Sequence, residues 1–64
     1  MRKLTAEERR IAQLIADGLT YEEMAGRMGI SPSTAKQHTA LLRAALGVRY
    51  KRQIPGVMRE LGLM

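Results

Sequence analysis

The stretch ISPSTAKQHTALLRAALG, residues 30–47, has the pattern of one helix with a defined start and end. Ser31 is a favourable N-cap residue, and Pro32 suits the first helical position because its missing N–H would be unpaired there in any case. Gly47 can end the helix in a left-handed conformation. The sequence therefore predicts a helix over Pro32–Leu46.

The predicted helix has two unlike faces. With about 100° of rotation per residue, one face is apolar and suits a core; its members are Ala35, His38, Leu42, Ala45 and Leu46. The opposite face is cationic, short and flat, and it consists of Lys36, Ala40, Arg43 and Ala44, with Gln37 at its edge. A basic face is also compatible with plain solvation, so its role depends on the rest of the chain.

Two shorter helices precede this one, and a Thr-x-x-Glu capping box opens each of them. They are predicted over residues 6–17 and 21–28. Apolar residues recur in them at helical spacing, and the expected buried side chains are Ile11, Leu14, Ile15, Met24, Ala25 and Met28. Only residues 29–31 separate the second helix from the third, which is the arrangement of a helix-turn-helix.

A fourth helix is predicted near the C-terminus, where helical spacing links Val57, Met58 and Leu61. Pro55 lacks a backbone donor and disfavours helix at Ile54, and Gly56 costs about 1 kcal/mol of helix propensity. We therefore expect this helix to be short and to begin within a residue or two of Pro55. Residues 49–53 are then expected to form an irregular basic segment.

Length and composition describe one small all-α domain over residues 1–64, a three- to four-helix bundle. Apolar residues make up 45% of the chain, but Phe, Trp and Cys are absent, so the core is aliphatic and thiolate metal sites are excluded. Such a core leaves no room for a large substrate cavity, and we expect neither an enzyme nor a cofactor. No apolar run approaches the roughly 18 residues of a membrane span, and we expect a cytoplasmic location.

Charge is segregated along the chain, which has a net charge of +5. Residues 1–23 hold five of the six acids, whereas residues 24–59 hold seven cations and no acid. A long span that is purely cationic favours a polyanionic partner. Double-stranded DNA is the partner that the helix-turn-helix pattern favours, and a DNA-binding protein of this kind is expected to associate with the nucleoid.

The cationic face of the third helix suits a DNA major groove, which is about 12 Å wide. Ala40 and Ala44 keep the face flat for close approach, while Lys36 can donate to guanine and Gln37 can pair with adenine. Arg43 lies two turns along, where the DNA backbone is in reach. In the first turn, the hydroxyls of Ser33 and Thr34 can donate to a phosphate.

Residues 4–48, LTAEERRIAQLIADGLTYEEMAGRMGISPSTAKQHTALLRAALGV, resemble the DNA-binding domain of LuxR-type (GerE-like) bacterial transcription regulators. The matching motifs, in order and without gaps, are LT with Glu8, LIAxGL at 14–19, EMA at 23–25, GIS at 29–31, TxKxH at 34–38 and LGV at 46–48, and LGL follows at 61–63. The resemblance implies a four-helix fold with the third helix in the major groove and the fourth often used for dimerisation.

Carried over by position, the resemblance places base contacts at Lys36, Gln37 and Ala40, and it adds backbone contacts around Thr34, Arg43, Arg49 and Lys51. Members of the family often carry Lys or Arg where Ala40 stands, so one base-reading cation is missing. Pro55 falls within the usual fourth helix, so we expect a weak homodimer that forms mainly on DNA. The family domain is commonly the C-terminal part of a longer regulator, and the chain is either a stand-alone regulator or a fragment.

The main alternative is a protein-binding helix-turn-helix that docks on RNA polymerase or on a larger regulator. It is favoured by the apolar tail Leu63–Met64, which we expect to be exposed, and by the missing cation at Ala40. Docking on an anionic membrane is disfavoured, because the apolar face lacks aromatic anchors and is needed for the core. His38, the only histidine, is expected to pack or to border a phosphate, and the adjacent acids Glu7 and Glu8 are expected to serve helix capping rather than acid–base chemistry.

Overall fold

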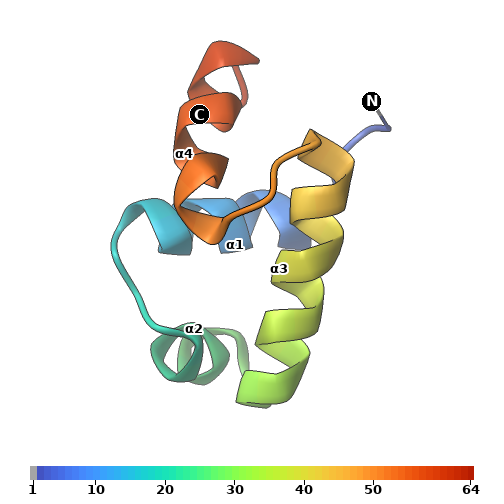
Figure 1. Ribbon diagram of the computed structural model, residues 1–64. Coiled ribbons are helices and arrows are strands. Elements are labelled where there is room, and N and C mark those ends of the chain that lie inside the picture. The colour runs from blue at the N-terminus through green and yellow to red at the C-terminus, as the bar shows by residue number, and fades with distance from the viewer. Residues whose placement is uncertain (1) are drawn as a thin grey trace.

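The computed structural model describes residues 2–64, which form four α-helices joined by short connections (Figure 1). The elements are, in order, α1 (Ala6–Ala16), α2 (Tyr21–Met28), α3 (Pro32–Leu46), the 3-10 turn η1 (Lys51–Gln53) and α4 (Ile54–Glu60). The predicted all-α fold with a helix-turn-helix is therefore confirmed, and α1 ends one residue before its predicted limit. No helix within the described range is long and apolar enough to span a bilayer.

Side-chain caps fix where α1 and α2 begin. In α1, the Glu8 N–H donates to Thr5 Oγ1 over 3.1 Å, and the Glu8 carboxylate accepts from the Thr5 N–H over 2.9 Å. Thr20 and Glu23 form the same reciprocal pair at the start of α2. These bonds satisfy backbone donors that have no partner within the first turn of a helix. The two capping boxes predicted from the sequence are confirmed.

The turn between α2 and α3 is built from a helix stop followed at once by a helix start. Gly29 ends α2 with a left-handed φ of 68°, a conformation that glycine adopts without steric cost. Ser31 then accepts the Thr34 N–H over 3.1 Å, and Pro32 occupies the first position of α3. Figure 1 shows the result: α2 lies beside the first turns of α3.

The core lies where α1 meets α3 and α4, while α2 packs mainly on α3 (Figure 1). It is aliphatic and Met-rich, as the composition predicts, and its buried apolar residues are Leu4, Ile11, Ala12, Leu14, Ile15, Met24, Ala25, Ala35, Leu42, Ile54 and Met58. The predicted buried residues of α1 and α2 are among them, with Met28 partly buried at the edge. The core therefore fixes the inner face of α3 and leaves the opposite face free.

The inner face of α3 differs from the prediction at two positions. Thr39 is fully buried, although it is not among the residues predicted for the apolar face. Its hydroxyl donates to the Ala35 carbonyl over 2.8 Å, so its own helix satisfies the polar group and the methyl group packs. His38 is only partly buried and lies toward the start of α1, at a pocket that Glu8 also lines.

The connection to α4 is more regular than predicted. Residues 49–53 are not wholly irregular, because Lys51–Gln53 form a 3-10 turn that runs directly into α4 at Ile54. Pro55 cannot donate to the Lys51 carbonyl as a continuous α-helix would require. In the 3-10 turn, the Lys51 carbonyl accepts a hydrogen bond from the Ile54 N–H instead. Ile54 adopts helical backbone angles despite the following proline because its side chain is fully buried. The short fourth helix starting beside Pro55 is confirmed.

The C-terminal tail is less exposed than predicted. Gly62, with a φ of 71°, turns the chain back after α4. The Leu63 N–H then donates to the Met58 carbonyl over 2.8 Å, and the Leu63 side chain packs against the core. Only Met64 of the predicted apolar pair is exposed.

Candidate nucleic-acid interface

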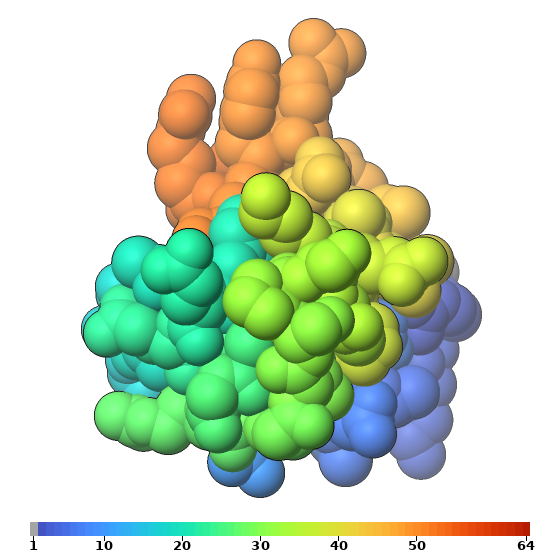
Figure 2. Space-filling model, turned by 90° about the horizontal axis from the view of Figure 1, so that it is seen from below, coloured from blue at the N-terminus to red at the C-terminus, as the bar shows by residue number. Residues whose placement is uncertain are grey.

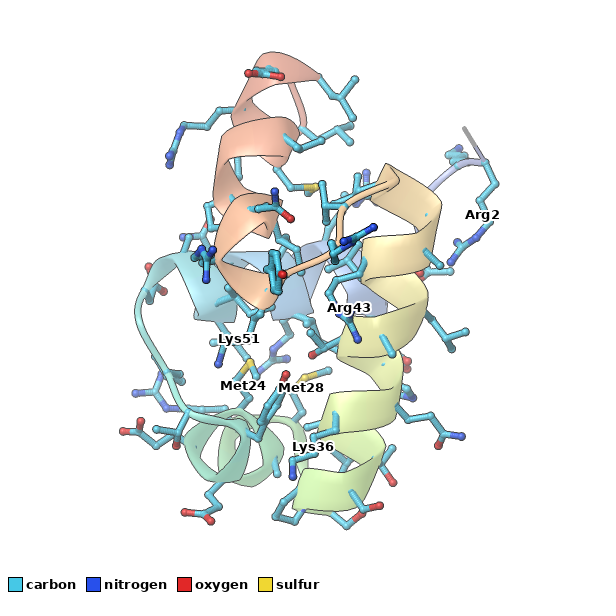
Figure 3. All side chains as sticks on the ribbon, viewed as in Figure 1. Arg2, Met24, Met28, Lys36, Arg43 and Lys51 are labelled. Carbon is cyan, nitrogen blue, oxygen red and sulfur yellow. The ribbon has the colours of Figure 1, made fainter. Side chains whose placement is uncertain are left out.

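The cationic side chains predicted to contact DNA gather on one side of the molecule. Lys36, Arg43 and Lys51 point to the same side, along α3 and beside η1 (Figure 3). In the view from below, side chains of the segment around residue 50 (orange) project from one edge of the body (Figure 2). Among all the predicted contact residues, those exposed are Ser33, Lys36, Gln37, Ala40 and Arg49, and those partly buried are Thr34, Arg43 and Lys51.

The start of α3 carries three hydroxyl side chains, those of Ser31, Ser33 and Thr34. The Ser31 and Thr34 hydroxyl oxygens are 2.9 Å apart, so one of them donates to the other. Since Ser31 also accepts the Thr34 N–H, the capping bond and the hydroxyl pair form one small network. Ser33 is exposed beside it. A helix N-terminus with hydroxyl donors of this kind suits an anionic oxygen.

A second network holds the segment after α3 in place. The Arg43 guanidinium donates to the Arg49 carbonyl over 2.8 Å. The Gln53 side-chain oxygen accepts the Arg49 N–H over 3.0 Å and the Tyr50 N–H over 2.8 Å. These bonds join α3, the connecting segment and η1, and they place the Arg49 and Lys51 backbone at fixed positions beside the cationic face of α3.

One aromatic ring, that of Tyr21, lies close to both predicted lysines. The Lys51 Nζ is 4.4 Å from the centroid of the Tyr21 ring, and the Lys36 Nζ is 5.7 Å from the same centroid. Both distances fall within the range of a cation–π interaction. The other tyrosine makes a local contact of this type, with the Arg52 guanidinium 4.6 Å from the centroid of the Tyr50 ring.

Of the adjacent acids Glu7 and Glu8, the capping bonds of α1 come from Glu8, and Glu23 has the same role in α2. Glu8 also accepts two hydrogen bonds from Arg2, one of 2.7 Å. The Arg2 guanidinium, followed by the capping bonds from Thr5, lowers the pKa of the Glu8 carboxyl to about 2. Backbone and hydroxyl bonds with Thr20 lower the pKa of Glu23 in the same sense. The ionised form of both carboxylates is therefore stabilised by the bonds that cap the helices.

One pocket of about 230 Å³ lies beside the Arg2–Glu8 pair, and its lining residues are Arg2, Thr5, Glu7, Glu8, His38 and Leu41. It is on the α1 side of α3 and does not include the predicted DNA-contact residues. Within residues 2–64, no group of three or more potential metal ligands is placed to hold an ion. The candidate interface is therefore the cationic face of α3 with the segment that follows it, and not this pocket.

Two residues of the interface were missed by reasoning from the sequence alone. Tyr21 was assigned no role, although it is the first residue of α2 and aromatic. Gln53 was included only as a member of a basic segment. A signal for Gln53 was present, because Gln three residues after Tyr50 is the spacing of the accepting residue in a capping box. The contacts of Tyr21 join three elements, and no local pattern in the sequence predicts them.

The chain matches a known protein family and known regulators. Residues 2–58 match the model for bacterial regulatory proteins of the luxR family. The chain is 42% identical over 45 residues to the transcriptional regulatory protein UhpA of Escherichia coli, and equally similar to UhpA of Salmonella typhimurium. The alignments cover 70% of this chain and 23% of each relative, so the chain spans about a quarter of the length of these relatives.

The fold also matches a solved structure. The crystal structure of response regulator ChrA in a heme-sensing two-component system superposes with a TM-score of 0.94 at 28% sequence identity, covering 100% of this chain and 32% of that chain. The family match, the two relatives and the helix-turn-helix geometry agree on DNA binding and transcription regulation. The chain belongs to the luxR family of bacterial regulatory proteins.

Proposed function

We propose that this domain regulates transcription by placing α3 in the major groove of double-stranded DNA and reading a few base edges there. The observation that carries the proposal is the outer face of α3. It combines exposed Lys36 and Gln37 with the flat Ala40, and Arg43 and Lys51 lie on the same side (Figure 3). A helix enters the major groove only if short side chains allow close approach and a few long polar ones reach the bases.

Each predicted residue has a distinct role in this proposal. Lys36 donates to a base edge and Gln37 pairs with one, while the short side chain of Ala40 lets α3 approach the bases closely. Contacts with the DNA backbone neutralise phosphates or donate hydrogen bonds to them. They come from Ser33, Thr34, Arg43, Arg49 and Lys51. The Arg43–Arg49 bond of 2.8 Å supports this division, because it holds the cations of the connecting segment beside α3.

A single domain with so few base contacts binds weakly unless two copies occupy paired half-sites. We therefore propose a homodimer that forms mainly on DNA. The short α4 (Ile54–Glu60) supports this view, because a helix of seven residues offers little apolar area for association in the absence of DNA. A protein with this function would act on the nucleoid in the cytoplasm.

A second candidate function is docking on RNA polymerase or on a larger regulator. Three exposed apolar side chains favour it: Leu41, Leu61 and Met64. The packing of Leu63 against the core weakens it, because the apolar tail is reduced to one residue. Salt separates the two functions. Three cations on phosphates give a slope of about −3 in log affinity against log salt, whereas apolar docking is nearly independent of salt.

The decisive experiment starts by selecting binding sites for the protein from a random pool of duplex DNA. Lys36→Ala is then expected to weaken binding to the selected site by about 1–3 kcal/mol and to relax the preference at one base pair. Lys3→Ala is the matched control, because Lys3 is an exposed lysine outside the candidate interface. If the protein enriched no sequence, or if Lys36→Ala left affinity and preference as in the parent, α3 would not be the reading helix.

A further inference from the structure

Tyr21 occupies an unusual place among the cationic residues. It is the first residue of α2, yet its ring lies next to the ammonium groups of Lys36 on α3 and Lys51 on η1, at 5.7 Å and 4.4 Å. Figure 3 shows these two labelled lysines on the same side of the molecule, reaching it from different elements. Three elements thus meet at one aromatic ring.

The ring is held more firmly than the cations around it. Tyr21 is partly buried and packs against the hydrophobic core. Its backbone lies in the first turn of α2, which the Thr20–Glu23 capping box fixes with bonds of 2.9 Å and 3.2 Å. A lysine, by contrast, carries its charge on a flexible four-carbon stem. The ring is therefore a fixed surface, and the lysine side chains are the parts that it can order.

Lys36 and Lys51 bring two positive charges close to the same ring, and the negative face of that ring attracts each of them. A side chain already held near its bound position also loses less conformational freedom when it binds. We infer that Tyr21 is a positioning residue for DNA recognition, which holds Lys36 toward the bases and Lys51 toward the phosphates in one fixed relation. The inference rests on the proposed function.

The second tyrosine shows what is particular about the first. Tyr50 is 48% exposed, and the cation over its ring, Arg52, is two residues away in the same segment. That contact orders only its own segment. The contacts of Tyr21 link Lys36 on the reading helix to Lys51, the proposed phosphate contact 15 positions further along the chain. They therefore affect the register in which α3 meets the bases.

The first measurement uses the free protein. NMR is expected to show upfield ring-current shifts for the terminal methylene protons of Lys36 and Lys51, assigned with the Lys36→Ala and Lys51→Ala variants. Tyr21→Phe keeps the ring and should keep both shifts. Tyr21→Leu keeps apolar bulk at the edge of the core, and it should lose both shifts while thermal unfolding shows that the variant still folds. Lysine shifts that are the same in Tyr21→Leu as in the parent would overturn the inference.

The second measurement uses the duplex selected by the parent and a scrambled duplex, at low salt so that weak variants still bind. Tyr21→Leu is expected to weaken binding to the selected site about three- to tenfold and to relax preference at the base pair that Lys36 reads. Tyr21→Phe should restore both. In a background with Lys36 and Lys51 both changed to Ala, Tyr21→Leu should cost less than about twofold, because the ring has no cation left to position.

Arg49 provides the matched control cycle. It is a cation of the candidate interface, and the bonds from Arg43 and to Gln53 hold its backbone rather than its side chain, which makes no cation–π contact with the Tyr21 ring. The cost of Tyr21→Leu should be the same with and without Arg49→Ala. If the parent binds its site and Tyr21→Leu binds it equally well, the inference is wrong and the proposed function stands. If the parent selects no duplex, the proposed function is wrong and the inference falls with it.

Discussion

Arg43 on α3 donates a 2.8 Å hydrogen bond to the backbone carbonyl of Arg49, six residues further along the chain. A guanidinium has five N–H donors, so this bond leaves others free for a phosphate. The same side chain can thus hold the connecting segment against α3 and contact DNA. A phosphate bound here would meet a donor whose position is already fixed by the fold.

Arg43→Ala is expected to weaken binding to all DNA sequences alike and to flatten the salt slope by about one unit. The physical reason is that it removes one phosphate contact without removing a base contact. Titrations of the selected and scrambled duplexes at several salt concentrations measure both effects. Arg59→Ala, which removes an exposed arginine of α4, serves as the control. A loss confined to the selected site would assign Arg43 to base reading.

Ala40→Arg should tighten binding to sites that carry guanine opposite this position, by about 1–3 kcal/mol, because arginine can engage guanine O6 and N7 together. Ala40 is exposed on the outer face of α3, so the longer side chain meets no core residue. A panel of duplexes randomised at each position measures the change. Unchanged affinity across the whole panel would show that Ala40 does not face the bases.

Replacing Pro55 and Gly56 together by alanine is expected to lengthen α4 and to strengthen self-association. Alanine at position 55 has the N–H that proline lacks, so it can donate to the Lys51 carbonyl and convert the 3-10 turn into α-helix. Sedimentation of the free parent at micromolar concentration should show a monomer, and the double variant should show more dimer. A stable dimer of the free parent would mean that the short helix does not limit association.

The Arg2–Glu8 pair makes stability depend on acid pH. The pKa of the Glu8 carboxyl is about 2 in the folded chain, below the ordinary value of 4.5 for a glutamate. The unfolded state therefore binds more protons between those two pH values. The stabilisation is therefore complete above about pH 4.5 and is lost as the pH falls toward 2. Urea unfolding across this range should show the loss in the parent and a smaller one in Glu8→Gln. Glu7→Gln, at the exposed neighbour, is the control and should behave as the parent does.

The sequence predicted the helices well because their starts and ends are set by local chemistry. Thr-x-x-Glu boxes, Ser31 before Pro32 and left-handed glycines act within a few residues, and each is visible in a single sequence. Thr39 is not among the residues predicted for the apolar face of α3, yet it is buried, because the Ala35 carbonyl accepts a hydrogen bond from its hydroxyl. Contacts that link distant elements could not be predicted in this way.

The same distinction applies to the candidate site. The outer face of α3 follows from helical periodicity, so Lys36, Gln37 and Ala40 could be placed on it from the sequence. To predict the 3-10 turn, one would need to know that Ile54 is buried, and that depends on how α4 packs on α1. The approach of Tyr21 to two lysines depends on the relative placement of α2, α3 and η1. Contact of any of these side chains with DNA stays a prediction.

The location of the two tyrosines has a practical consequence for spectroscopy. The chain contains no tryptophan, so the ultraviolet emission of Tyr21 and Tyr50 is not masked by energy transfer to an indole. Each ring lies beside a cation: the Tyr21 centroid is 4.4 Å from the Lys51 Nζ of the candidate interface, and the Tyr50 centroid is 4.6 Å from the guanidinium of Arg52, which follows Lys51 in the chain. Intrinsic fluorescence of the unmodified protein should therefore change when duplex DNA is added, and Tyr21→Phe would leave Tyr50 as a single-site reporter of the same event.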